Sequence, residues 1–334
     1  MKKSLIIIPL LLVAVFFAAC SSNKKAAAEA DAAATEPVGP DFNADSAYSF
    51  CARQCDFGPR TMNSDAHDAC GEWIMAQFKR FGLDVTAQRA TLKGYDGTPL
   101  KATNIIASYR PELTTRILLC AHWDSRPWAD NDPDSTNHRQ PVMAANDGAS
   151  GVAVMLEVAR LLAADTARLA VGVDFVCFDA EDWGIPQWSD TEGGDDSWAL
   201  GAQYWANNPH KQNYEARYGI LLDMVGGQGA NFYREGFSLQ YAPAIVKKIW
   251  AAAKTVGFGS RFPDSDGGMI TDDHVPVNQL RKIPTVDIIP FYPDCAQSNF
   301  GPTWHTVNDT MENIDPATLK AVGQTVVQVL WSER

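Results

Sequence analysis

The chain has 334 residues, of which 46% are hydrophobic and 20% charged, and its formal net charge at pH 7 is -12. This acidic balance argues against a nucleic-acid-binding protein, which needs a basic surface to meet phosphates. The length exceeds that of a minimal domain and suits one large α/β domain. No internal repeat and no second linker divides it.

The first twenty residues have the pattern of a bacterial lipoprotein signal. Lys2 and Lys3 form a basic start, and the apolar stretch from Leu5 to Phe17 is too short for a comfortable membrane span. Small residues then lead to Cys20, which we expect to be the lipidated first residue of the mature protein. A membrane-anchor helix or an ordinary secreted signal is the alternative. The prediction places the protein in the bacterial cell envelope, anchored by lipid and facing the periplasm or the surface.

The rest of the chain divides into a linker and one domain. Residues 21–41 are rich in Ala, Glu and Pro and lack apolar periodicity, which predicts a flexible tether. Residues 42–334 are expected to form a single domain. Cys51, Cys55 and Cys70 lie in two predicted neighbouring helices, and the oxidising envelope favours one disulfide among them. Their pairing stays open.

The predicted elements begin with two helices and a hairpin-like pair of strands, after which strands and helices alternate. Asp45 is the expected N-cap of the first helix, and Ser64 that of the second. Such alternation, with continuous apolar strands, predicts an α/β protein: a three-layer α/β/α sandwich around a mixed, mostly parallel central sheet. The expected helices span 46–55, 64–81, 149–164, 198–207, 242–256 and 316–331, and the expected strands span 85–92, 104–109, 116–121, 171–178, 218–222 and 285–289.

Acidic and imidazole side chains follow three of the predicted strands. His122 and Asp124 come after one strand, Glu181 and Asp182 after a second, and Asp223 after a third. Sheets of this kind bind ligands beyond the carboxyl ends of their strands. Carboxylates and histidines that converge from separate segments suit a zinc site of the hydrolytic type, in which one carboxylate remains as a base.

Three more clusters belong to the same pattern. Asp147 opens a glycine-rich turn into a helix, where an aspartate is most often an N-cap. Asp272, Asp273 and His274 suit either a surface turn or a buried hydrogen-bond network. A further pair, Trp304 and His305, lies in a loop-like stretch. The remaining histidines are expected at the surface or in turns: His67, His138 and His210.

Taken in order, these motifs resemble the zinc aminopeptidase superfamily with co-catalytic metals, over roughly Ser46 to the C-terminus. The superfamily motifs are His122-x-Asp124, Asn146-Asp147-Gly148-Ala149-Ser150-Gly151, Glu181-Asp182, Asp223 and His305. Further features are similar to its glutaminyl cyclase branch: Phe57-Gly58-Pro59-Arg60, Trp188, Asp272-Asp273-His274-Val275-Pro276 and Trp304-His305-Thr306.

The resemblance implies a zinc-dependent catalytic domain with one zinc ion per chain, held by Asp147, Asp182 and His305. The animal-type enzymes of the glutaminyl cyclase branch have Glu at the position of Asp182. The Asp side chain is one methylene shorter than that of Glu. The zinc or the loop must therefore shift to keep the metal–oxygen bond. The implied reaction converts an N-terminal glutamine of a peptide or protein to pyroglutamate and releases ammonia.

The resemblance also implies a role for the other motif residues. Glu181 is the proton-shuttling carboxylate, and Asp272 holds the substrate's amino group and is coupled to Asp223. The expected substrate-binding residues are Trp304, the pocket walls Trp188 and Phe300, and Ile270 at their border, and the expected supporting residues are His122, Asp124 and His274. The rival on the same fold is a di-zinc aminopeptidase, in which His122 and Asp223 would be additional ligands. A binding lipoprotein with a decayed site is a weaker rival, because every motif position keeps a usable side chain.

Overall fold

The computed structural model describes residues 36–166, 169–190 and 195–333, so the predicted signal with Cys20 and most of the predicted tether lie outside the described residues. No helix in these ranges is both long and apolar enough to cross a membrane. The helices are α2 (Ala44–Cys55), α3 (Asp65–Arg80), α4 (Ala149–Ala164), α5 (Leu200–Asn207), α6 (Gly236–Tyr241), α7 (Pro243–Thr255), α8 (His274–Pro276) and α9 (Pro316–Trp331). Three short 3₁₀-helices in the described residues are η1 (Ser135–Asn137), η2 (Asp195–Ser197) and η4 (Met311–Asn313), and η3 (Val277–Arg281) is a π-helix.

Within the described residues, six strands form one mixed sheet in the order β1-β2-β4-β3-β5-β6. The strands are β1 (Asp84–Lys93), β2 (Pro99–Tyr109), β3 (Arg116–His122), β4 (Gly172–Phe178), β5 (Gly219–Leu222) and β6 (Thr285–Ile288). The pairs β1–β2 and β2–β4 are antiparallel, whereas β4–β3, β3–β5 and β5–β6 are parallel. The predicted mixed, mostly parallel sheet is confirmed.

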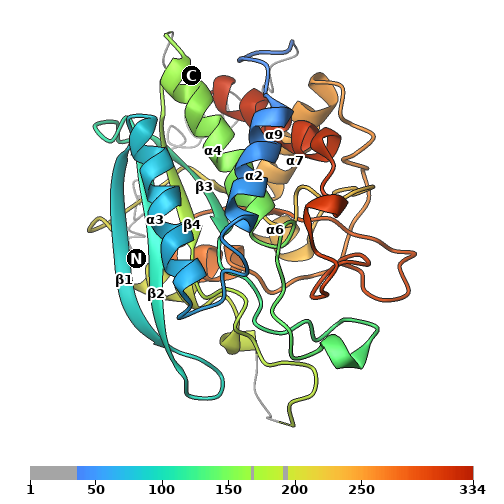
Figure 1. The fold of residues 1–334 in the computed structure, drawn as a ribbon. Coiled ribbons are helices and arrows are strands. Elements are labelled where there is room, and N and C mark those ends of the chain that lie inside the picture. Colours follow the sequence, from blue (N-terminus) through green and yellow to red (C-terminus); the bar gives the residue numbers. More distant parts are fainter. Residues whose placement is uncertain (1–35, 167–168, 191–194, 334) are drawn as a thin grey trace, which may run out of the picture.

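Helices cover both faces of the sheet, which confirms the predicted three layers. Successive strand residues point to opposite faces, so β3 sends Leu119 into one core and Leu118 into the other. The larger core lies between the sheet and α2, α3, α4, α7 and α9. Figure 1 shows α3 along β1 and β2, with α2, α4 and α9 grouped beside one another. The smaller core is covered by α5, through Trp205, and by Val277 and Ile283.

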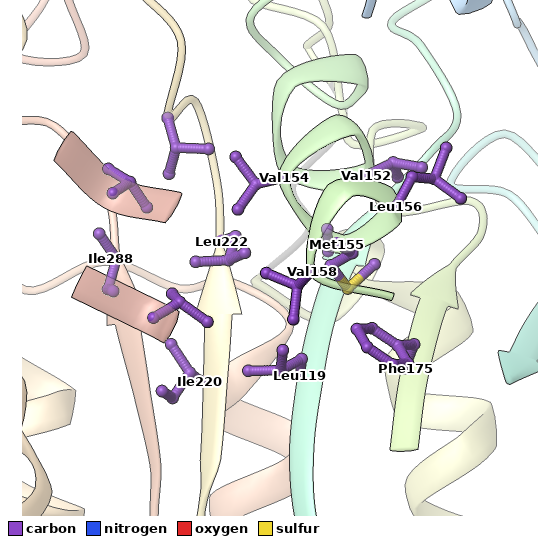
Figure 2. Close-up of a cluster of buried hydrophobic side chains, with 14 of the residues drawn as sticks. Leu119, Val152, Val154, Met155, Leu156, Val158, Phe175, Ile220, Leu222 and Ile288 are labelled. Carbon is purple, nitrogen blue, oxygen red and sulfur yellow. The ribbon is translucent and has the colours of Figure 1, made fainter. Parts of the chain in front are cut away.

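Helix α4 is the centre of the larger core. Almost all of its residues are buried, because it lies between the sheet and the outer helices α2 and α9. Figure 2 shows Met155 and Val158 of α4 facing Leu119, Phe175 and the side chains of β5. Each such fully buried side chain contributes roughly 1.5–3 kcal/mol. This packing fixes the start of α4 relative to the strand ends.

The packed part of the chain begins before Phe42. The Val38 amide donates to Gln328 of α9 at 2.7 Å, and the Phe42 amide donates to Gln324 at 2.8 Å. The Phe42 ring is fully buried against α9. The first helix is capped by Asn43, whose side chain accepts from the Ser46 amide at 3.0 Å, and the prediction of Asp45 as its cap is wrong.

The expected disulfide is wrong, because Cys51, Cys55 and Cys70 are all free thiols. The Cys51 thiol donates to the backbone carbonyl of Ala145 at 3.0 Å, just before the turn that carries Asp147. Burial raises the pKa of Cys70 to about 12, which keeps this thiol protonated and unreactive.

Candidate active site

The predicted clusters meet at the carboxyl ends of β3, β4 and β5, where they border a cavity of about 290 Å³. Side chains from seven separate segments enclose it, so the site forms only in the folded protein. The lining includes Asp147, Glu181, Trp198, Asp223, Met269, Ile270, Asp272, Phe300, Trp304 and His305.

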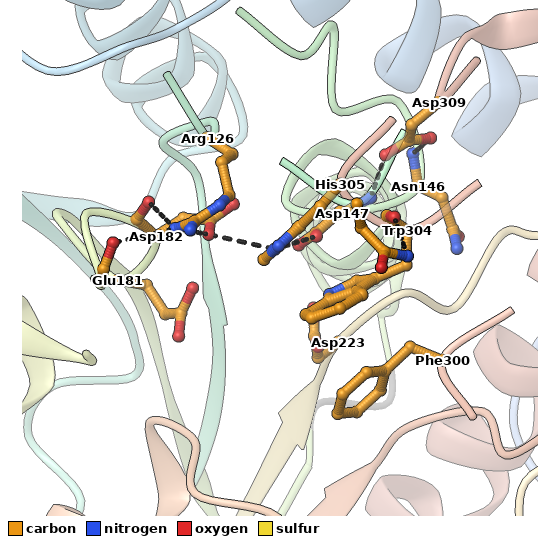
Figure 3. Close-up of polar contacts among 12 residues, drawn as sticks. Arg126, Asn146, Asp147, Glu181, Asp182, Asp223, Phe300, Trp304, His305 and Asp309 are labelled. Carbon is orange, nitrogen blue, oxygen red and sulfur yellow. Dashed lines mark hydrogen bonds and ion pairs between the residues drawn. The ribbon is translucent and has the colours of Figure 1, made fainter. Parts of the chain in front are cut away.

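Three side chains form a group that can hold a metal ion. Ligand atoms of Asp147, Asp182 and His305 all lie within 4.8 Å of one another (Figure 3). The Nε2 atom of His305 is 3.2 Å from Asp182 Oδ1 and 3.5 Å from Asp147 Oδ2. Asp182 Oδ2 is buried and has no hydrogen-bond partner within the described part of the chain. Two carboxylates, one imidazole and an unused buried oxygen suit zinc.

Asp147 reaches this group because two glycines bring its turn close to the sheet. Gly148 has φ of 107°, which L side chains rarely adopt, and a β-carbon on Gly151 would lie 2.1 Å from the Leu222 carbonyl oxygen. Helix α4 begins after Gly148, so Asp147 does not cap it. Its carboxylate instead lies 3.0 Å from the Nε2 atom of His122.

Two buried carboxylates accept hydrogen bonds from the backbone of the turns that carry Asp147 and Asp182. Asp309 accepts hydrogen bonds from the amides of Asn146 and Asp147 at 2.8 and 3.0 Å. Asp124 accepts from the amides of Glu181 and Asp182, both at 3.1 Å. Asp124 thus contacts the backbone of the turn that carries Glu181 and Asp182. Asp309 lies four residues after His305, and that spacing was the one available sequence signal for it.

Several residues beside the site have left-handed backbone. Ala180 precedes Glu181 with φ of 54°, Met224 follows Asp223 with φ of 49°, and His305 itself has φ of 53°. Such conformations cost of order 1–3 kcal/mol in residues with a β-carbon. They persist because the surrounding contacts hold the ligand-bearing turns in place.

Glu181 lies beside the metal group without belonging to it. Its carboxylate is 4.0 Å from the Nδ1 atom of His122 and lines the cavity. Burial raises the pKa of Glu181 well above its usual range; the positive charge on His122 opposes this, and the adjacent Asp182 adds to it. A raised pKa suits a carboxyl that must accept a proton and then donate it.

His122 links the metal group to Asp223. Its Nε2 atom is 3.0 Å from Asp147 Oδ1 and 3.3 Å from Asp223 Oδ1. Burial raises the pKa of Asp223 to about 7, against the effect of the hydrogen bond from His122, and Asp272 raises it further. His122, Asp147 and Asp223 also form a group whose ligand atoms lie within 4.8 Å of one another.

The Asp272–His274 segment is buried, so the surface-turn alternative is wrong. Asp272 lines the cavity, while Asp273 and His274 are completely buried behind it. His274 Nε2 is 3.0 Å from Glu235, and its Nδ1 is 3.9 Å from Asp287. The segment thus joins the cavity, through Asp272, to a buried network of His274, Glu235 and Asp287.

Aromatic rings form one wall of the cavity. The Trp304 ring stacks on His305 with centroids 3.7 Å apart and contacts Phe300 at 4.7 Å. Trp198 lies parallel to His305 at 5.9 Å and also lines the cavity. Trp188 does not line it, contrary to expectation. Its ring instead stacks with His138, with centroids 6.2 Å apart, and lies 4.0 Å from the Arg139 guanidinium carbon.

Sequence reasoning missed two charged residues behind the ligands, Arg126 and Asp130, which are both buried. It also placed His67 wrongly. His67 is buried, lies 2.9 Å from Asp179 and stacks on Trp123 at 4.2 Å. The Asp179 carboxylate also accepts from the Ala180 amide at 2.9 Å, so the pair supports the turn before Glu181.

Comparisons with known proteins agree with this geometry. The model of peptidase family M28 matches residues 104–330. A crystal structure of a Bacteroides thetaiotaomicron glutaminyl cyclase bound to N-acetylhistamine is 52% identical, covers 89% of this chain and 100% of its own, and superposes with a TM-score of 0.87. A structure described as a leucine aminopeptidase precursor from the same species is 51% identical, covers 89% of this chain and 100% of its own, and has a TM-score of 0.85.

Curated relatives are more distant. Aminopeptidase YwaD of Bacillus subtilis is 26% identical over 76% of this chain, and the glutaminyl-peptide cyclotransferase of Gloydius blomhoffii is 25% identical over 65%. The matched regions span 50% and 61% of the lengths of these two relatives. Both the aminopeptidase and the cyclase descriptions thus occur among similar proteins, and the chemistry of the site must separate them.

Proposed function

This chain belongs to peptidase family M28, and we propose that within the family it is a glutaminyl-peptide cyclotransferase with one zinc ion per chain. It closes the N-terminal glutamine of a peptide or protein to pyroglutamate and releases ammonia. The observation that carries the proposal is the cavity itself, which combines a group of possible metal ligands, the adjacent carboxyl of Glu181, the cavity-lining carboxyl of Asp272 and aromatic walls. Solved glutaminyl cyclases that are about half identical to the chain support it.

Ring closure needs one nitrogen to replace another at the γ-carbonyl carbon of the glutamine. The bond from the α-nitrogen forms, and the bond to the amide nitrogen breaks. Glu181 can take the proton that the α-nitrogen loses and give it to the departing ammonia, because burial raises its pKa. Zinc held by Asp147, Asp182 and His305 would polarise the γ-carbonyl group.

The remaining residues orient the substrate. Asp272 faces the cavity as a buried carboxylate and can accept hydrogen bonds from the α-amine. Trp304, Phe300 and Ile270 border the same space and can enclose the methylenes of a folded-back glutamine. Holding the amine near its own carboxamide supplies much of the rate through orientation. The reaction activates no water, so a second metal ion is not needed.

The rival is a di-zinc aminopeptidase. It is favoured by the second group, in which ligand atoms of His122, Asp147 and Asp223 lie within 4.8 Å of one another. An aminopeptidase would use this group for a second zinc ion and an activated water. Two tightly bound zinc ions per chain, with release of the N-terminal amino acid, would decide for this rival.

One experiment separates the two reactions. Purified full-length protein is incubated with a glutamine-leading peptide and with the same peptide led by leucine, each with and without a chelator. The cyclase releases ammonia and leaves a blocked N-terminus on the first peptide only, and chelation stops the reaction. Free glutamine or leucine without ammonia would contradict the proposal.

We also propose that the protein is lipid-anchored in the cell envelope through Cys20, which supports a role on secreted or surface peptides. The basic start, the short apolar stretch and the small residues before Cys20 support this. Fractionation of cells that express the wild type and a Cys20→Ala variant tests it. The wild type is expected in the membrane fraction with a lipid-modified N-terminal peptide. Equal membrane association of the variant would contradict the anchor.

A further inference from the structure

We propose that three consecutive residues, Asp130, Asn131 and Asp132, form a clamp that positions His305 and Trp304. The Asn131 amide donates to the His305 carbonyl at 3.0 Å, and its side-chain amide donates to the Trp304 carbonyl at 3.2 Å. Asp132 accepts from the backbone two residues beyond His305 at 3.1 Å. Asp130 Oδ1 lies 3.5 Å from the Nδ1 atom of the His305 ring. The inference deepens the proposed function and rests on it.

The clamped loop cannot hold this geometry alone. His305 has φ of 53°, in the left-handed region, and the stretch that carries it is neither helix nor strand. Strained residues of this kind persist only where the surroundings over-determine them. The clamp supplies contacts on both sides of His305, at the Trp304 carbonyl and at the amide of Val307.

The contact of Asp130 sets the direction of the imidazole. A carboxylate beside Nδ1 favours the proton on that nitrogen and leaves Nε2 as the electron-pair donor. Nε2 is the atom that faces Asp182 and Asp147, at 3.2 and 3.5 Å. Asp130 therefore favours the tautomer and the ring orientation that His305 needs to bind a metal ion through Nε2.

Arg126 joins the clamp to a second ligand. Its guanidinium donates to both oxygens of Asp130, at 2.8 and 2.6 Å. It also donates to the carbonyl of Asp182 at 3.1 Å and lies 3.4 Å from Asp182 Oδ1. Only 1% of Arg126 is exposed, so these contacts are not exchanged with water. Through Asp130 and Arg126, the positions of His305 and Asp182 are coupled.

Zinc affinity, measured without substrate, tests the clamp. The dissociation constant of zinc for the full-length protein is obtained by competition with a chromophoric chelator. Asp130→Asn is expected to weaken zinc binding by about 10- to 100-fold, as loss of a carboxylate behind a ligating histidine does. The matched control is Asp134→Asn in the same loop, because Asp134 is exposed and caps only its own turn. A zinc affinity of Asp130→Asn within twofold of wild type would overturn the clamp.

A double-mutant cycle separates positioning from general damage. In a His305→Ala background, Asp130→Asn is expected to change zinc affinity by several-fold less than in the wild type, because the ring it orients is gone and only the contact through Arg126 to Asp182 remains. An undiminished effect in that background would overturn the assignment. Wild-type protein that binds no zinc would instead contradict the proposed function, so the two failures are distinguishable.

A second variant keeps the test decisive if Asp130→Asn does not fold. Asn131→Ala removes the bond to the Trp304 carbonyl but keeps the backbone bond to His305, and Asn131 is only half-buried. It is expected to raise the KM for a glutamine-leading peptide about fivefold, with zinc affinity close to wild type. An unchanged KM would overturn the role of the clamp at Trp304.

Discussion

Glu181 and Asp182 are neighbours in the chain, but the structure gives their carboxylates different surroundings. Asp182 lies against Arg126 and His305, whereas Glu181 faces His122 and the cavity. Adjacent residues leaving a strand point in different directions, so one turn can supply both a ligand and a proton carrier. The different surroundings of the two carboxylates depend on the contacts that hold this turn in place.

Glu181→Gln tests the proton transfer. The variant keeps the size of the side chain and cannot carry the proton, so kcat for ring closure is expected to fall by about 10²- to 10⁴-fold. Zinc affinity should stay close to wild type, because Glu181 is not a ligand. Glu215→Gln, at an exposed position, is the control. A kcat within threefold of wild type would exclude Glu181 as the proton carrier.

The aromatic wall is tested by a pair of tryptophans. Trp198 lines the cavity and Trp188 lies outside it. Trp198→Ala is expected to raise the KM for a glutamine-leading peptide about tenfold, because it removes apolar surface around the bound side chain. Trp188→Ala should change KM by less than twofold. Steady-state kinetics of both variants check this prediction. A larger rise in KM for Trp188→Ala than for Trp198→Ala would mean that Trp188, and not Trp198, contacts the bound side chain.

Cavity side chains could be predicted from the sequence where they directly follow a strand or belong to a short motif. Asp147, Asp182 and His305 do converge, and Glu181 and Asp272 do face the same space. Arg126 and Asp130 were not predictable, because their roles arise from contacts between loops that are distant in the chain. Trp198 was missed for the same reason.

Glu235 joins two elements behind the site. It caps α6 by accepting from the amides of Phe237 and Ser238, and it also accepts from the Ile270 amide at 3.0 Å. Its contact with His274 at 3.0 Å ties α6 to α8. One buried carboxylate therefore fixes the segment that presents Ile270 and Asp272 to the cavity.

The lowered pKa of Glu235 predicts how the free energy of unfolding depends on pH. Burial alone would raise its pKa, but the hydrogen bond from His274 and its charge outweigh burial, so the pKa falls from 4.5 to about 2. A lowered folded-state pKa stabilises the protein above pH 4.5, and this contribution is lost as the pH falls toward 2. Glu235→Gln is therefore expected to cost about 2–3 kcal/mol at pH 7.

Denaturant unfolding of the wild type and Glu235→Gln at several pH values checks this. The difference between the two proteins should be full at pH 7 and shrink between about pH 4.5 and 2. Glu312→Gln, at an exposed position in η4, is the control and should show no such trend. A difference that is constant from pH 7 to pH 3 would mean that packing rather than charge explains the effect of Glu235.

Helices and strands were largely predictable because each core element has a strong apolar pattern. The helix predicted at 149–164 and the strand predicted at 116–121 match α4 and β3 closely. Sequence did not predict that β2 pairs antiparallel with β4, which places the hairpin of β1 and β2 at the sheet edge. Pairing of this kind depends on long-range contacts that local patterns do not encode.

At the scale of the whole molecule, the topology explains why one site can draw on so many segments. Strands β4, β3 and β5 are parallel neighbours, so their carboxyl ends lie at the same edge of the sheet. His122 is the last residue of β3, and the loops after β4 and β5 carry Glu181, Asp182 and Asp223. His305 lies at the same edge in a later loop. A metal ion bound here would connect parts of the fold that are far apart in sequence.

Metal binding should therefore stabilise the whole fold. Asp147, Asp182 and His305 come together only in the folded protein, so zinc at 100 times its Kd adds about 2.7 kcal/mol to the free energy of unfolding. For a domain of this size, chelation is expected to lower Tm by roughly 4–5 °C. The shift is expected to shrink strongly in His305→Ala and to persist in His122→Ala, as it should if one zinc ion is held by Asp147, Asp182 and His305. Calorimetric titration of the metal-free protein should give one zinc ion per chain. Two equivalents, with a smaller shift in His122→Ala, would mean that His122 and Asp223 hold a second ion.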